Sequence, residues 1–185
     1  SNYKRNSPFA NAALVVSVDH QKLFGNDLFG GLKLRRDLER KSYVAIQDAG
    51  GSKELPAQSL PDFIAGKTGA PRAGSSPSGA LSVRLDQILP SFLRERLLEG
   101  LERFDRNMKG FISPEAQFYG VESRTSCPIR VVRDPETLQS ASHAGLYPAG
   151  EGAGYAGGIT SAACDGVRIA DQIAQTLFRV ETRIP

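Results

Sequence analysis

The stretch from Leu146 to Ala170 reads LYPAGEGAGYAGGITSAACDGVRIA, the order of a short strand, a glycine-rich turn and a helix. Such a density of glycine lets the backbone approach a ligand closely and leaves unpaired amides at the start of the helix that follows. These amides and the helix dipole favour negative charge. The sequence therefore predicts a strand over 146–149, an anion-binding turn, and a helix over 159–178.

The turn also matches a dinucleotide-binding pattern by spacing, because Gly152, Gly154 and Gly157 stand in the order Gly-x-Gly-x-x-Gly. In a first Rossmann turn, this pattern is followed by a helix, a second strand and an acidic residue that binds a ribose. The residues after Gly158 are too few for the helix and a second strand with its loops. The pattern is therefore not interpreted as the first turn of a Rossmann unit.

The segment resembles the terminal flavin-binding motif of bacterial FAD-dependent oxidoreductases in the glutathione-reductase-like superfamily. More narrowly, it is similar to FAD-dependent dehydrogenases whose chains end close to GLYPAGEGAGYAGGI-S-A-DG. Three further stretches resemble the same family: Ser76 to Pro90, Glu122 to Arg130, and Arg133 to Ser140. The resemblance implies that the chain is the C-terminal part of an FAD-dependent oxidoreductase, which caps the flavin and forms its substrate side.

The resemblance also implies which residues contact FAD. They are the turn and the start of the helix: Gly150, Glu151, Gly152, Gly154, Gly157, Gly158 and Ile159. Glu151 would accept hydrogen bonds from ribityl or ribose hydroxyls, and the helix amides would favour the negative charge of reduced flavin. Contacts to a small-molecule substrate are assigned to Arg124, Thr125 and Ser126, since a guanidinium binds carboxylates bidentately. Catalytic residues, the substrate and the use of NAD(P) are left open.

Residues 1–145 contain no strand, glycine-rich turn and helix of the kind that holds the ADP half of FAD in this superfamily. We therefore expect an N-terminal part of the parent protein to be missing, and the chain alone to be inactive and without tightly bound FAD. The sequence begins with Ser-Asn and no Met, so residues 1–2 are interpreted as a protease-cleavage remnant. Residues 3–142 are expected to form an inserted substrate-side domain, and residues 143–185 the terminal strand, turn and helix of the FAD-binding domain.

The predicted fold class is α+β. An antiparallel sheet is expected from residues 12–18, 117–121 and 129–132, covered by helices over 28–41 and 91–105. Residues 49–79 are rich in Gly, Pro and Ser and are expected to form a loop with a short helix over 60–65. The terminal strand and helix are expected to belong to a Rossmann-type parent sheet. The open edge of that strand predicts a homodimer.

Composition excludes several other classes of protein. The net charge is only +3 and the basic residues are spread along the chain, which argues against nucleic-acid binding. No apolar run approaches the roughly 18 residues of a membrane span, and two Cys among 185 residues favour the cytoplasm. Two His without nearby ligands predict no metal site. The alternative function is a stand-alone anion- or nucleotide-binding or protein-interaction domain without catalysis.

Overall fold

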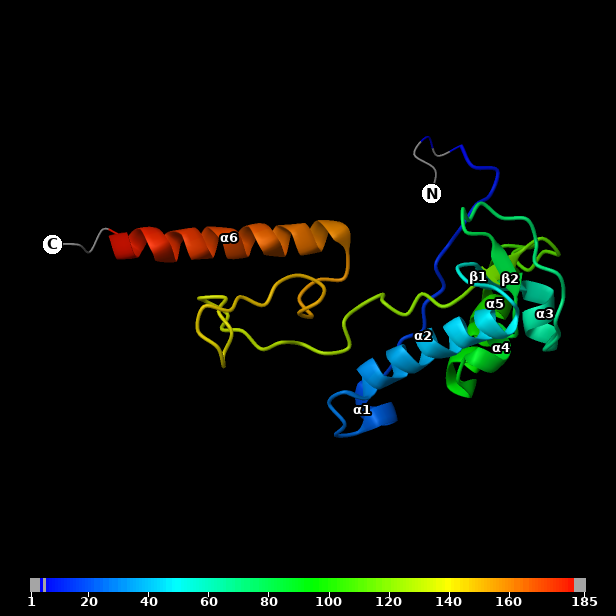
Figure 1. The fold of residues 1–185 in the computed structure, drawn as a ribbon, viewed down its shortest axis with the longest axis horizontal. Helices are drawn as coiled ribbons and strands as arrows, with labels where there is room; N and C mark the ends of the chain where they lie inside the picture. Colours follow the sequence, from blue (N-terminus) through cyan, green and yellow to red (C-terminus); the bar gives the residue numbers. More distant parts are fainter. Residues whose placement is uncertain (1–3, 5, 182–185) are drawn as a thin grey trace. The chain divides into compact units, whose positions relative to one another are not determined.

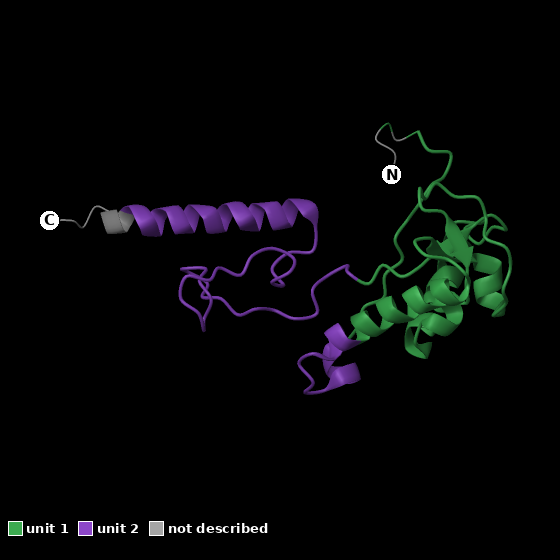
Figure 2. Ribbon diagram, viewed as in Figure 1, with its two compact units in different colours: residues 1–19, 34–123 green, residues 20–33, 124–185 purple. Residues whose placement is uncertain are grey.

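The structure, a computed structural model, describes Lys4 and residues 6–181 and forms two compact units (Figure 2). Unit 1 comprises residues 1–19 and 34–123, and unit 2 comprises residues 20–33 and 124–185. Residues 1–2, predicted to be a cleavage remnant, lie outside the described residues. The long helix α2 (Gly30–Asp48) begins in unit 2 and continues into unit 1.

Unit 1 is built on a small mixed sheet with the strand order β2-β1-β3; β1 and β2 are labelled in Figure 1. The strands are β1 (Leu55–Ser59), β2 (Ala80–Ser82) and β3 (Gln117–Tyr119). The central strand is parallel to β2 and antiparallel to β3, so that Ala57 lies opposite Ser82 on one side and Tyr119 on the other. Four of its five residues are buried, which explains why a strand as polar as Leu-Pro-Ala-Gln-Ser is stable there.

Four helices supply the rest of the unit 1 core: α2, α3 (Leu60–Ala65), α4 (Leu85–Ile88) and α5 (Ser91–Asn107). Helix α3 begins at Ser59, whose hydroxyl accepts from the Asp62 amide, and it ends at Gly66 in the left-handed region. The main cluster of buried apolar residues is Ile46, Leu60, Phe63, Val83, Leu85, Ile88 and Leu101. Phe63 is fully buried and packs edge-to-face on Phe118, with ring centroids 4.9 Å apart.

A buried polar network joins the sheet to α4. The Gln58 side-chain amide donates to the Asp86 carboxylate at 2.8 Å and to the Lys67 carbonyl at 2.9 Å, and its oxygen accepts from the Asp86 amide. Asp86 also receives two bonds from Arg84, at 2.6 and 2.7 Å. Arg84 thereby lowers the pKa of Asp86, against the opposing effect of burial. Every buried polar atom of Gln58 is thus satisfied, as a packed core requires.

Unit 2 contains the short helix α1 (His20–Phe24), irregular backbone from residue 124 onwards, and the 23-residue helix α6 (Ile159–Glu181). On α6, Ile169 is buried and Ala162, Ile173 and Ala174 are half-buried. The one pairing of β type described in this unit is an isolated antiparallel bridge between Arg133 and Ser140.

Several sequence predictions are confirmed. The class is α+β, and the helices predicted over 60–65, 91–105 and 159–178 correspond to α3, α5 and α6. The strand predicted over 117–121 is present as the shorter β3, and the helix predicted over 28–41 is present as α2, which continues to Asp48. Helix α3 has the expected start, with the Ser59 hydroxyl capping its first turn, whereas α5 begins at Ser91 after Pro90 without a side-chain cap.

Other predictions are wrong. The sheet is mixed rather than antiparallel, and residues 12–18, 129–132 and 146–149 are not strands. The apolar run over 12–18 is mostly exposed, although Leu14 packs against the core. The two missed strands, β1 and β2, lie at 55–59 and 80–82, where polar and small residues hide the signal. A strand of three to five residues depends on its partners more than on its composition. The domain boundaries, the Rossmann-type parent and the homodimer stay predictions.

The buried ring of Phe63 gives a test of the unit 1 core. Phe63→Ala should lower the free energy of unfolding by about 3–5 kcal/mol, because it leaves a cavity beneath the sheet. The measurement is urea unfolding followed by circular dichroism. Tyr43→Ala, which removes a ring that is 62% exposed on α2, should cost less than about 0.5 kcal/mol. Equal costs for the two variants would contradict this packing.

Candidate functional site: the glycine-rich turn before helix α6

Residues 150–155 fold into a compact turn that leads towards α6. The Tyr155 amide donates to the Gly150 carbonyl at 2.9 Å, and the Gly154 amide donates to the Glu151 carbonyl at 2.9 Å. Gly150 and Gly154 both have positive φ, at 62° and 83°. At position 154 a Cβ atom would also collide with the Ile129 carbonyl oxygen. The glycines are therefore required by the shape of the turn as well as by any ligand.

The link that precedes Arg133 runs alongside this turn. The Cys127 thiol lies 3.3 Å from the Gly152 carbonyl, and the Arg130 side chain donates through Nε to the Gly154 carbonyl at 3.0 Å. Further along, the Val131 amide donates to the Ala153 carbonyl at 3.1 Å. The link over 122–130 and the turn over 150–155, which lie apart in the sequence and both resemble the flavoprotein family, are thus brought together.

A buried ion pair lies behind the turn. The guanidinium of Arg133 forms two bonds with the Asp165 carboxylate on α6, at 2.6 and 2.9 Å, and the two side chains are only 5% and 10% exposed. Arg133 also donates to the Pro148 carbonyl at 2.7 Å, and Asp165 accepts from the Gly150 amide at 2.8 Å. The pair therefore ties the chain entering the turn to α6.

The aromatic ring of Tyr155 covers the same guanidinium. The Arg133 guanidinium carbon lies 3.6 Å from the ring centroid, and that of Arg130 lies 5.0 Å away. The Tyr155 hydroxyl donates to the Val131 carbonyl at 3.1 Å and accepts from the Arg133 amide at 3.2 Å. Tyr155 thus anchors the residues that leave the turn.

The electrostatics of the ion pair follow from these contacts. Hydrogen bonds from Arg133 lower the pKa of Asp165 from 3.8 to about 2, against the opposing effect of desolvation and with help from the Gly150 amide. Asp165 in turn raises the pKa of Arg133. Both groups are therefore charged at neutral pH.

Helix α6 begins with amides that have no protein partner. The first bond into the helix runs from the Ala162 amide to the Gly158 carbonyl at 2.9 Å. Within the described part of the chain, the amides of Ile159, Thr160 and Ser161 find no acceptor. Ile159 is 92% exposed. These three donors are available to an anionic or carbonyl group.

The residues predicted to bind FAD fall into two groups. The amides of Gly150 and Gly154 are bonded inside the protein, so these residues shape the turn. Gly152, Gly157, Gly158 and Ile159 are exposed, and open space surrounds the α-carbon of Gly152. The Glu151 side chain is half-buried.

Arg124, Thr125 and Ser126, predicted to face the substrate, are exposed. The Thr125 carbonyl oxygen is 3.9 Å from where a Cβ on Gly157 would stand, so part of this link lies next to the turn. Sequence reasoning missed Arg133, Tyr155 and Asp165. The signal that could have found them is Asp165 itself, because a carboxylate within a run of small helical residues needs a partner when that face is packed.

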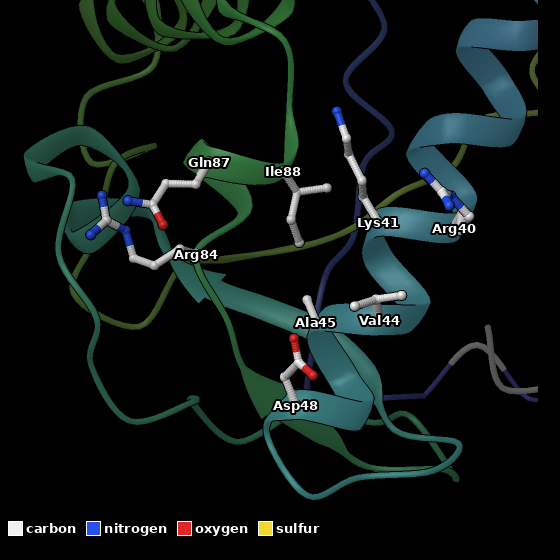
Figure 3. A pocket seen from close by; sticks show the side chains of 8 residues that line it. All are labelled: Arg40, Lys41, Val44, Ala45, Asp48, Arg84, Gln87 and Ile88. Carbon is white, nitrogen blue, oxygen red and sulfur yellow. The ribbon is translucent and has the colours of Figure 1, made fainter.

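Unit 1 contains a separate pocket of about 430 Å³ (Figure 3). It is lined by Arg40, Lys41, Val44, Ala45, Asp48, Arg84, Gln87 and Ile88. Lys41 is paired with Asp37 at 2.8 Å, and Arg84 is paired with Asp86 at 2.6 Å. Arg40 lies 3.8 Å from the same Asp37 carboxylate, and Asp48 adds a negative charge, so the pocket is lined by charges of both signs. None of the residues predicted to contact FAD lines it.

The described residues contain neither a metal-binding cluster nor a membrane-spanning helix. Over Lys4 and residues 6–181, no three His, Cys, Asp or Glu side chains are grouped so that they could hold a metal ion. No helix in the same part of the chain has the length and apolarity to cross a membrane.

Comparison with known proteins identifies the family. Residues 1–125 match the family described as "FAD-dependent protein, C-terminal domain-like". The chain is also 36% identical over 178 residues to an uncharacterized protein of Clostridium beijerinckii (strain ATCC 51743 / NCIMB 8052). That alignment covers 95% of this chain and 33% of the relative. The chain therefore belongs to this family of C-terminal domains of FAD-dependent proteins, and it spans about a third of the length of its relative.

The lowered pKa of Asp165 gives a pH prediction. A carboxyl with a depressed pKa in the folded state stabilises the fold above its unfolded pKa, and the contribution is lost as pH falls from about 3.8 to about 2. The ¹³C shift of the Asp165 carboxyl should therefore titrate near pH 2, and Arg133→Met should raise that midpoint. A midpoint at or above 3.8 in the unaltered chain would contradict the pairing.

The two kinds of glycine in the turn should respond differently to substitution. Gly154→Ala should destabilise unit 2 by about 1–3 kcal/mol, because the new side chain combines a positive φ with a steric collision. Gly152→Ala, where no atom lies within 4 Å of the new Cβ, should change stability by less than about 1 kcal/mol. Thermal unfolding followed by circular dichroism compares them, and the reverse order would rule out the described path of the turn.

Proposed function

We propose that this chain is the C-terminal portion of an FAD-dependent oxidoreductase, and that it caps the flavin and forms the substrate side of the active site. Membership of the FAD-dependent family supports an association with FAD. The observation that carries the proposal is the start of α6, where three consecutive unbonded amides follow two exposed glycines, Gly157 and Gly158. Such donors suit a group that becomes negative when it is reduced.

The residues present fit this cofactor. The amides around Gly157, Gly158 and Ile159 would donate to the flavin, and the open backbone at Gly152 permits close approach of a bulky ligand. Glu151 would accept hydrogen bonds from ribityl or ribose hydroxyls. Gly150 and Gly154 would act through the shape of the turn, since their own amides are already bonded.

FAD, when bound, supplies the two-electron chemistry, and the protein binds and orients it. The amides at the start of α6 would favour the reduced, anionic form. On the substrate side, we propose that Arg124, Thr125 and Ser126 contact a small anionic molecule, because this exposed link includes Thr125, next to Gly157. The start of α6 would thus bind the flavin, and the adjacent link over 124–126 would bind the substrate.

The surface of α6 supports the proposal that the rest of the parent chain completes the site. Ile159, Val167, Leu177 and Phe178 are exposed by 92%, 62%, 62% and 67%. With small residues between them, they form an apolar stripe along one side of the helix. The relative is about three times as long as this chain, which leaves ample polypeptide to cover the stripe. The chain alone is therefore expected to be inactive and to hold FAD weakly.

The proposal is tested by comparing the full-length parent with the 185-residue chain. The purified parent should carry about one FAD per polypeptide, visible by its flavin absorption, whereas the chain alone should be colourless. A parent with no affinity for added FAD would overturn the proposed function. Stoichiometric FAD on the chain alone would overturn the part of the proposal that requires the missing segment.

Glu151 gives a residue-level test in the full-length parent. Glu151→Gln should raise the FAD dissociation constant about tenfold, because a neutral amide is a weaker acceptor for ribityl or ribose hydroxyls. Fluorescence titration of the apoprotein measures the constant. Glu136→Gln, which changes an exposed glutamate in another turn of unit 2, is the matched control and should leave it unchanged. Equal FAD dissociation constants for the two variants would show that Glu151 does not bind FAD.

The electron donor is identified by anaerobic reduction of the same protein. We propose that a nicotinamide nucleotide or the organic substrate delivers a hydride to the flavin. Addition of NADH or NADPH to the oxygen-free holoprotein should bleach the flavin absorption if nicotinamide is the donor. A spectrum that both nucleotides leave unchanged would rule out nicotinamide as the donor.

A further inference from the structure

One ion pair holds both ends of the glycine-rich turn. Where the chain enters the turn, Arg133 binds the Pro148 carbonyl at 2.7 Å and Asp165 binds the Gly150 amide at 2.8 Å. Where it leaves, the Tyr155 ring lies 3.6 Å from the same guanidinium and its hydroxyl accepts from the Arg133 amide. The backbone between these anchors is glycine-rich, so these contacts restrain its shape.

The polar atoms of the pair are directed into the protein. Both oxygens of Asp165 are bonded to Arg133, and one of them also accepts from Gly150. The two side chains are 5% and 10% exposed, and the Tyr155 ring covers the guanidinium. Arg133 and Asp165 are therefore poorly placed to contact a ligand, although both lie directly behind the turn. Any effect they have on a bound cofactor must act through the backbone.

We propose that Arg133 and Asp165 are positioning residues. They hold residues 148–155, which include the turn, against α6, so that the exposed amides at the start of α6 keep the arrangement that binds FAD. This inference rests on the proposed function. A glycine-rich turn loses much conformational entropy when a ligand fixes it. An ion pair that fixes the turn beforehand removes that cost from binding, which is the usual benefit of preorganisation.

A positioning role can be distinguished from a role in stability, because a buried ion pair can often be replaced without loss of stability. Desolvation of two charges cancels much of their attraction, so a pair of well-packed apolar side chains often gives equal or greater stability. An apolar pair at positions 133 and 165 would keep the packing of α6. It would lose the bonds to the Pro148 carbonyl and the Gly150 amide, which only charged or polar groups can make.

The experiment therefore uses one polar and one apolar variant. Asp165→Asn keeps the shape but loses the charge, and the double variant Arg133→Met with Asp165→Leu replaces the whole pair. Asp171→Asn, an exposed aspartate on the same helix, is the charge control. Ile169→Val, which removes one buried methyl group from α6, is the stability control.

Two quantities are measured for each variant. Hydrogen exchange of the amides of residues 149–155 is followed in the 185-residue chain without cofactor, and the FAD dissociation constant is measured in the full-length parent. Both altered-pair variants should speed exchange of the turn, and raise the dissociation constant, by about tenfold or more. The double variant should do so even where its unfolding temperature equals that of the unaltered protein. The two controls should leave the dissociation constant unchanged.

Two results would overturn the positioning role. One is a double variant that regains stability and binds FAD as tightly as the unaltered parent. The other is faster exchange of the turn in Asp165→Asn with an unchanged dissociation constant. In both results the parent still binds FAD, so the proposed function survives while this inference fails. A parent that binds no FAD refutes the proposed function and this inference with it, even if exchange confirms that the pair restrains the turn.

Discussion

The buried pair of Arg133 and Asp165 is the interaction on which the organisation of unit 2 depends. A charge that is removed from water must find a partner, and here a residue of the irregular segment meets a residue of α6. The residues of unit 2 that surround it contain little regular β pairing. The pair, with Tyr155 stacked on it, therefore joins this irregular backbone to α6, in addition to the backbone hydrogen bonds within the segment.

Unit 1 uses the same kind of restraint in a different setting. Gln58 and Asp86 join the central strand to α4, and Arg84 neutralises the carboxylate. Here the polar network lies beside an apolar core centred on Phe63. Burial of the apolar side chains stabilises the unit, and the network fixes the position of α4 against the central strand. In unit 2, Leu138, Ala153 and Ile169 are buried, and the pair of Arg133 and Asp165 joins the segment before the turn to α6.

The helices could be predicted from sequence because their signals are local. Apolar spacing is enough to locate α5 and α6, and Ser59, whose hydroxyl caps the first turn, marks the start of α3. The sheet could not be predicted, because β1 and β2 are short segments whose state depends on pairing between distant parts of the chain. Residues 12–18 are predicted to form a strand from their β-branched residues, but they pair with no strand and remain mostly exposed.

For the site, the composition of the turn located the exposed amides but could not show which were already used. Only the fold reveals that the amides of Gly150 and Gly154 are bonded internally, and that Arg133 meets Asp165 across 32 positions. A resemblance of short motifs places residues near a cofactor. It does not separate those that touch the cofactor from those that hold the turn in shape.

The proposal that the start of α6 faces the flavin can be checked by a crystal structure of the full-length parent with FAD. The pyrimidine edge of the flavin should then lie within hydrogen-bonding distance, about 2.7–3.2 Å, of an amide among Gly157, Gly158 and Ile159. Flavin bound elsewhere, with these amides facing solvent or packed against another segment of the protein, would contradict it.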